Sequence, residues 1–146
     1  MADTLYFEDV SEGIDLPELV KTLNSISMMM YGAATWDFMR VHYDADHARE
    51  KGFVGPFVDG QMEGAFLAQL VINWAGDPGS LRSLGVKYRN FVYPGDTIVC
   101  KGKVQRKFID KTDALVTCEL VVENTTRQEV ASSGSAVVVL QRRPSL

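Results

Sequence analysis

The sequence GQMEGAFLAQLVINWA, residues 60–75, is the stretch that decides the fold of this 146-residue chain. Its only polar side chains are Gln61, Glu63, Gln69 and Asn73. A helix that is apolar on nearly all sides is a buried one, and this one is too short and too interrupted to span a membrane. We therefore expect residues 60–75 to form a helix at the centre of the fold, ended by the turn residues Asp77-Pro78-Gly79.

After residue 80 the apolar side chains recur at every second position, which is the period of a β-strand. Four segments show this alternation, around residues 84–88, 98–104, 114–122 and 130–140. Residues 93–96, 109–112 and 124–127 lie between them and have the composition of hairpin turns or short loops. We expect an antiparallel meander of four consecutive strands. Its apolar face needs a covering layer, so the sheet should curl around the 60–75 helix in an α+β fold.

The region before residue 60 predicts smaller elements. Residues 17–23 alternate loosely and indicate a strand, and residues 26–34 indicate a short helix with Asn24-Ser25 as its N-cap. A second helix should begin at 44–46 and stop at Gly52. The three methionines 28–30 could line an adaptable pocket, although filling of the core by flexible side chains is the favoured interpretation.

Length and composition indicate a single domain, residues 1–146, with a hydrophobic content of 46% that is enough for one core. The formal net charge of −4, with scattered Lys and Arg, disfavours binding to nucleic acid or to anionic membranes. The N-terminus lacks the basic start and apolar stretch of a secretory signal, so we expect a cytoplasmic protein with no membrane association.

The two cysteines and two histidines argue against a metal centre. Cys100 and Cys118 have no CxxC spacing and lie in alternating apolar segments, which favours reduced thiols packed in the core over a disulfide. With His42 and His47 as the only imidazoles, a zinc site is improbable. We predict no metal.

The candidate site lies in the stretch WDFMRVHYDADHAREKGFVGPFVDG, residues 36–60. Asp37 and His42 are separated by four residues, and Gly60 opens the buried helix eighteen positions after His42. Proton transfer next to a developing oxyanion needs groups that move the proton and an N–H donor that stabilises the charge. A carboxylate, an imidazole and a helix-opening glycine are those parts, which makes this stretch the candidate site.

Each candidate also has a structural interpretation. Asp37 could hydrogen-bond the end of the preceding helix, His42 could be a satisfied histidine beside aromatic residues, and Gly60 could be a turn glycine. His47 and Asp44 fit an exposed or capping role. Lys87 and Arg89, on one strand face, could meet the phosphates of a coenzyme, although such pairs are more often solvated.

Several motifs in order resemble a known family. They are Asp-x4-His-x-Asp from Asp37, Gly-Phe-x-x-Pro-Phe from Gly52, the helix-opening Gly60, and Tyr-Pro-Gly-Asp from Tyr93. This arrangement is similar to that of the MaoC-like acyl dehydratases, the (R)-specific enoyl-CoA hydratases of the hotdog fold. The resemblance covers residues 25–105 by motif and the remaining strands by pattern.

The resemblance implies roles residue by residue. Asp37 and His42 match the catalytic pair that activates a water for addition to a trans-2-enoyl-CoA, giving a 3-hydroxyacyl-CoA. Gly60 matches the glycine whose N–H binds the thioester carbonyl. The family implies an acyl-CoA substrate, a place in fatty acid metabolism, no cofactor, and a homodimer or higher homo-oligomer whose sheets pair edge to edge.

Two departures keep other functions open. Many members have Asn-Pro between the catalytic residues, where this chain has residues 38–41, Phe-Met-Arg-Val. Members commonly have His before the glycine, where this chain has Asp59, for which Arg40 is a candidate partner. The alternatives are a hotdog acyl-CoA thioesterase and a non-catalytic subunit of a heteromeric hydratase.

Overall fold

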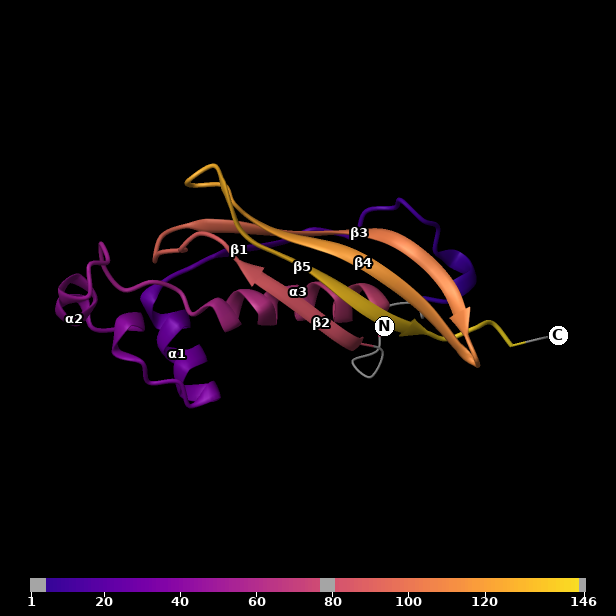
Figure 1. Cartoon of the computed structure of the whole chain (residues 1–146), viewed down its shortest axis with the longest axis horizontal. Helices are drawn as coiled ribbons and strands as arrows, with labels where there is room; N and C mark the ends of the chain where they lie inside the picture. The colour runs from indigo at the N-terminus through magenta and orange to yellow at the C-terminus, as the bar shows by residue number, and fades with distance from the viewer. Residues whose placement is uncertain (1–4, 77–80, 145–146) are drawn as a thin grey trace.

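In the computed structural model, a five-stranded antiparallel sheet curves over helix α3, Gly60–Ala75 (Figure 1). The structure describes residues 5–76 and 81–144, so the predicted turn at residues 77–79 lies outside the described part. The strands are β1 Leu19–Thr22, β2 Leu81–Tyr88, β3 Thr97–Asp110, β4 Asp113–Asn124 and β5 Glu129–Leu140. The predicted α+β arrangement, with a sheet wrapped around the 60–75 helix, is confirmed.

The predicted order of the strands is wrong in one respect. The sheet order is β1-β3-β4-β5-β2, so only β3, β4 and β5 form a meander. Strand β2 pairs with β5, and β1 occupies the other side of β3. Residues 93–96 therefore belong to a connection across the sheet and do not form a hairpin. An alternating pattern identifies the buried face of a strand but does not show which strand pairs with it in the sheet.

Helix α3 faces the sheet with one side and is not buried all round. Its buried residues recur at helical spacing and are Met62, Glu63, Gly64, Leu67, Leu70, Val71 and Ala75. A stripe of Gln61, Ala65, Gln69 and Asn73 is exposed. Three of the four polar residues of the helix thus lie on the side that the sheet leaves uncovered, and Glu63 is the exception.

The elements between β1 and α3 lie beyond one end of the sheet (Figure 1). They are helix α1 Ser25–Thr35, a 3-10 turn Arg40–His42 and helix α2 Ala45–Glu50. The predicted caps are confirmed, because Asn24 accepts from the Ser27 N–H at 2.9 Å and Asp44 from the His47 N–H at 3.0 Å. Met28 is buried whereas Met29 and Met30 are exposed, so core filling applies to Met28 alone.

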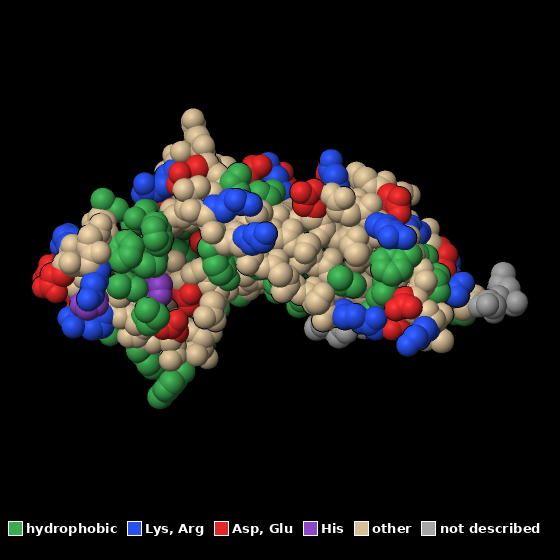
Figure 2. All heavy atoms as spheres, in the orientation of Figure 1, with side chains coloured by type: hydrophobic (Ala, Val, Ile, Leu, Met, Phe, Trp, Pro, Cys, Tyr) green, Lys and Arg blue, Asp and Glu red, His purple; other side chains and the backbone are tan. Residues whose placement is uncertain are grey.

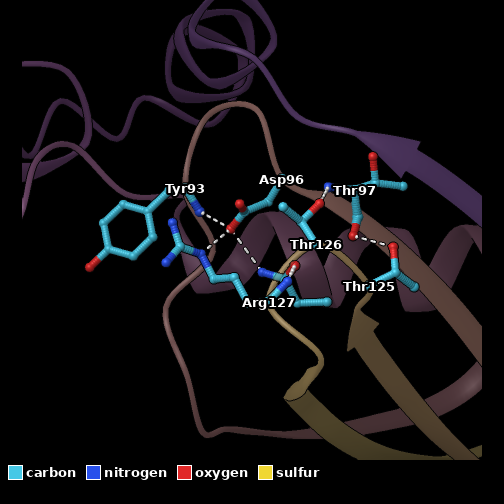
Figure 3. Close-up of polar contacts among 7 residues, drawn as sticks. Tyr93, Asp96, Thr97, Thr125, Thr126 and Arg127 are labelled. Atoms are coloured by element: carbon cyan, nitrogen blue, oxygen red, sulfur yellow. Dashed lines mark hydrogen bonds and ion pairs between the residues drawn. The ribbon is translucent and has the colours of Figure 1, made fainter.

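Asp96 of the Tyr-Pro-Gly-Asp segment links the connection between β2 and β3 to the turn between β4 and β5 (Figure 3). Its carboxylate accepts hydrogen bonds from the Tyr93 N–H at 3.0 Å, the Asn124 amide at 2.8 Å and Arg127 Nε at 2.7 Å. Burial by itself raises the pKa of Asp96, but these three donors outweigh it and leave the pKa below its usual value. This motif residue is therefore structural.

Both thiols are free and buried, as predicted. Burial raises the pKa of Cys100 to about 12 and that of Cys118 to about 11, which makes both thiols unreactive near neutral pH.

Within residues 5–76 and 81–144, no helix combines the length and the apolar character required to cross a bilayer.

Candidate active site

The end of helix α1 positions Asp37. Trp36 adopts a left-handed conformation, with φ 60° and ψ 28°, and this reverses the chain after the last helical turn. The Asp37 N–H then donates to the Gly32 carbonyl at 2.9 Å, and Asp37 Oδ1 accepts from the Met39 N–H at 3.0 Å. One carboxylate oxygen thus shapes the following turn, and the other has no protein donor within the described residues.

Gly32 makes this reversal possible. A Cβ at Gly32 would lie 2.8 Å from the carbonyl oxygen of Asp37, closer than side-chain carbons approach backbone oxygens. The missing side chain allows the chain to fold back on the helix, so Gly32 and Asp37 act together in placing the carboxylate.

His42 is held by a backbone carbonyl. Its Nδ1 lies 2.8 Å from the Phe57 oxygen, and its ring meets the Phe57 ring edge-on at 5.0 Å between centroids. A carbonyl oxygen can only accept, so Nδ1 carries the hydrogen of this bond. Nε2 is therefore the nitrogen available for proton transfer.

Asp37 and His42 meet in one cavity despite the absence of Asn-Pro between them. The cavity has a volume of about 250 Å³. Its lining is largely apolar and consists of Met28, Met29, Gly32, Ala33, Asp37, Phe38, His42, Tyr43, Asp59 and Met62. Figure 2 shows hydrophobic side chains gathered over the end of the molecule that carries α1 and α2. An apolar cavity with a few converging polar groups is typical of a small-molecule site.

Gly60 lines a neighbouring hollow instead. It shares a space of about 290 Å³ with Glu63, Tyr88 and Arg89 among others. Gly60 is the first residue of α3, and its N–H donates to no acceptor within the described residues. The Tyr88 ring lies 3.0–3.2 Å from the position of a Cβ on Gly60, so the ring occupies the space that a side chain would need. The chain therefore brings Asp37 and His42 together in one cavity, and Gly60 directly follows Asp59, which lines that cavity.

Asp59 does not pair with Arg40, its candidate partner from the sequence. Arg40 instead binds Asp44 at 2.6 Å. The Asp44 N–H also donates to the Arg40 carbonyl at 2.8 Å, so the turn between them holds the two side chains close. Asp59 caps α3 by accepting from the Gln61 N–H at 2.9 Å. Asp59 also lines the cavity of Asp37 and His42. One side-chain nitrogen or oxygen atom of each of these three residues lies within 4.8 Å of the others. Divalent metals use such donor sets, so the expectation of no metal remains a prediction.

Glu63 is a feature that the sequence-based site did not include. It is 3% exposed and accepts a hydrogen bond from Ser132 Oγ at 2.7 Å. Burial raises the pKa of Glu63 to about 7; the Ser132 hydrogen bond opposes the rise and the charge of Asp59 adds to it. The sequence could have identified Glu63, because it is the single acidic residue in residues 60–75 and lies one helical turn after Gly60.

Lys87 and Arg89 are exposed at the end of β2. Arg89 Nε donates to Ser133 Oγ at 3.2 Å, so part of its guanidinium is occupied by the neighbouring strand. Contact of these residues with a coenzyme phosphate remains a prediction.

Comparison with known proteins yields related sequences and folds. A family model described as MaoC like domain matches residues 13–127. The chain is 30% identical over 133 residues to the 3-oxo-4,17-pregnadiene-20-carboxyl-CoA hydratase beta subunit of Mycobacterium tuberculosis, over 91% of this chain and 97% of that protein.

Solved structures extend the likeness. A chain of the ChsH1-ChsH2 complex from Mycobacterium tuberculosis has a TM-score of 0.79 and 26% identity, over 90% of this chain and 98% of that one. The R-hydratase PhaJ1 from Pseudomonas aeruginosa has a TM-score of 0.84 and 18% identity, over 98% and 92% of the two chains. The second likeness shows the fold alone, and it is the expected hotdog fold.

Proposed function

This chain belongs to the MaoC-like domain family, and from that premise we propose that it is a hydratase that interconverts a trans-2-enoyl-CoA and a 3-hydroxyacyl-CoA. The observation that carries the proposal is the meeting of Asp37 and His42 in one apolar cavity. The Phe57 carbonyl leaves His42 Nε2 free for proton transfer, and Asp37 keeps one carboxylate oxygen without a protein donor in the described residues.

The reaction needs one proton removed and one supplied. In the hydration direction, the oxygen of a water bonds to C3 of the enoyl group while one O–H proton passes to a basic group of the Asp37–His42 pair. The π electrons move to C2, which receives a proton from the other member of the pair. The two transfers balance, and dehydration is the same sequence reversed.

Gly60 would stabilise the charge that develops on the thioester oxygen. Gly60 is the first residue of α3, and its N–H donates to no protein acceptor within the described residues. The helix dipole also favours negative charge at this end. A substrate lying across the start of α3 would have its double bond in the cavity of Asp37 and His42. Its thioester would face Gly60, and its coenzyme would lie towards the exposed Arg89.

The cavity lining supports an apolar acyl group as the substrate. Methionine side chains and Phe38 supply flexible apolar contacts that adapt to more than one chain shape.

The test is hydration of a panel of trans-2-enoyl-CoAs of increasing chain length and branching, followed by loss of enoyl absorbance. We expect Asp37→Asn and His42→Ala each to lower kcat by about 100-fold or more. Full activity in both variants would contradict the site. A parallel thiol assay detects free CoA, whose release without enoyl consumption would indicate a thioesterase instead.

A second candidate is a subunit of a heteromeric hydratase. The observation that favours it is the relative with 30% identity, which is the beta subunit of a hydratase. We propose the homodimer as the working state, and light scattering of the purified chain tests it. An inactive monomer that gains activity only with a second MaoC-like chain would establish the heteromeric function.

A further inference from the structure

Asp59 has no part in the reaction described so far, yet it shares the cavity of Asp37 and His42. No Lys or Arg forms an ion pair with it within the described residues, and its candidate partner Arg40 binds Asp44. Capping of α3 occupies one oxygen of this half-buried carboxylate, and the other oxygen has no protein donor within the described residues.

We propose that Asp59 is a third catalytic residue, which binds and orients the water that adds to the substrate. This inference rests on the proposed hydratase function. One side-chain nitrogen or oxygen atom of each of Asp37, His42 and Asp59 lies within 4.8 Å of the others. For any such triangle there is a point no more than about 2.8 Å from all three corners, the length of a hydrogen bond to water. A water at that point would contact all three residues.

The hydrogen-bonding capacity of the three groups matches that of a water. A water has two O–H donors and two lone pairs in a tetrahedral arrangement. With His42 protonated on both nitrogens, Nε2–H donates to one lone pair, while the carboxylates of Asp37 and Asp59 accept the two O–H groups. The second lone pair is left to attack C3.

Each proton then has a defined destination. The water oxygen bonds to C3, the O–H held by Asp37 breaks and its proton passes to Asp37, and Nε2 gives its proton to C2. The O–H held by Asp59 stays intact and becomes the hydroxyl of the product. Proton exchange with solvent afterwards restores Asp37 and His42 to their starting states.

The capping role of Asp59 is compatible with this function. Its Oδ1 accepts from the Gln61 N–H and not from the Gly60 N–H, so the Gly60 N–H remains available for the thioester. Its second oxygen has no protein donor in the described residues and can accept from the water.

The experiment separates capping from water binding. Asn and Ser cap helices about as well as Asp, so Asp59→Asn and Asp59→Ser preserve the start of α3. The Asn amide turns a donor towards a water O–H, and the Ser side chain is too short to reach. We expect both variants to keep the melting temperature and the KM and to lose about 10- to 100-fold in kcat. Asp44→Asn, a matched change in the cap of α2 outside the cavity, should keep kcat.

The outcomes distinguish this proposal from the proposed function. Wild-type kcat in both Asp59 variants, with Asp37→Asn inactive, would overturn the role of Asp59 and leave the hydratase standing. Loss of activity with EDTA and its return with a divalent cation would replace the water-binding arrangement by a metal site. A high-resolution crystal structure tests Asp59 even if no enoyl-CoA is turned over. It should show a water within hydrogen-bonding distance of all three residues in the wild type and not in Asp59→Ser, and a wild-type site without that water would refute the proposal.

Discussion

The Nδ1 atom of His42 lies 2.8 Å from the carbonyl oxygen of Phe57, which joins the 3-10 turn after α1 to the loop before α3. This bond fixes both the tautomer of His42 and the direction of Nε2. The position of Phe57 depends in turn on its ring, which packs against Phe53 and Phe91 at centroid distances of 4.7 Å. An aromatic cluster that takes no part in proton transfer therefore sets the orientation of the imidazole.

Phe57→Ala should uncouple this arrangement. Loss of the ring contacts frees the loop and its carbonyl, so we expect kcat to fall about 10-fold and the free energy of unfolding to fall by about 2 kcal/mol. Phe57→Leu, which keeps an apolar side chain in place, is the control and should lose less of both. Hydration kinetics and chemical denaturation measure the two effects, and an unchanged kcat in Phe57→Ala would show that the ring does not hold His42.

Gly32→Ala should disturb Asp37. The new Cβ would lie 2.8 Å from the Asp37 carbonyl oxygen, so the turn after α1 must shift. Because Ala is the better helix former by about 1 kcal/mol, overall stability should change little while kcat drops. Gly55→Ala, where no atom lies within 4 Å of the added Cβ, is the matched control. Equal kcat in the two variants would contradict the prediction.

Gly60→Ala should clash with Tyr88. The added Cβ would lie 3.0–3.2 Å from the ring, and we expect a loss of about 1–3 kcal/mol in the free energy of unfolding. A smaller side chain at position 88 makes room, so Gly60→Ala combined with Tyr88→Val should recover part of this loss relative to Tyr88→Val alone. Chemical denaturation of the four proteins in this double-mutant cycle gives the coupling, and simple additivity would argue against the contact.

Glu63→Gln should change how stability depends on pH. The pKa of Glu63 rises from 4.5 to about 7 on folding, so its protonated form stabilises the folded state below pH 4.5. This contribution is lost as the pH rises through about 7. A glutamine side chain cannot ionise. The free energy of unfolding of the variant should therefore increase by about 3 kcal/mol relative to that of the wild type when the pH is raised from 4 to 8.

Denaturant unfolding of both proteins at several pH values measures this difference, in which the other titrating groups cancel. A difference that stays constant from pH 4 to pH 8 would mean that Glu63 is not protonated in the folded state near neutrality.

Asp96→Asn should destabilise the fold, and more so at neutral than at acidic pH. The carboxylate holds Tyr93, Asn124 and Arg127, and loss of its charge should cost about 2–3 kcal/mol at pH 7. Because folding lowers the pKa of Asp96, its contribution is present above the ordinary Asp range and is lost as the pH falls through the folded value. Unfolding at pH 7 and pH 3 tests this. The gap between wild type and variant should shrink at pH 3, and a gap that widens would refute the assignment.

The local sequence pattern alone determined the type and approximate position of the main helices and strands. The apolar run of residues 60–75 identified the central helix, period-two alternation identified the strands, and Asn24 and Asp44 identified two helix starts. These are properties of neighbouring residues, since helix caps, periodicity and turn chemistry act over a few positions.

Only the tertiary structure decided which distant groups meet. The place of β2 beside β5, the pairing of Arg40 with Asp44, and the entry of Asp59 into the cavity of Asp37 and His42 depend on how whole elements pack. The carbonyl that orients His42 belongs to Phe57. Every residue has a backbone carbonyl, so the sequence does not show which one binds the imidazole. Side-chain types set what chemistry was available, and packing across the chain set which of those groups share one cavity.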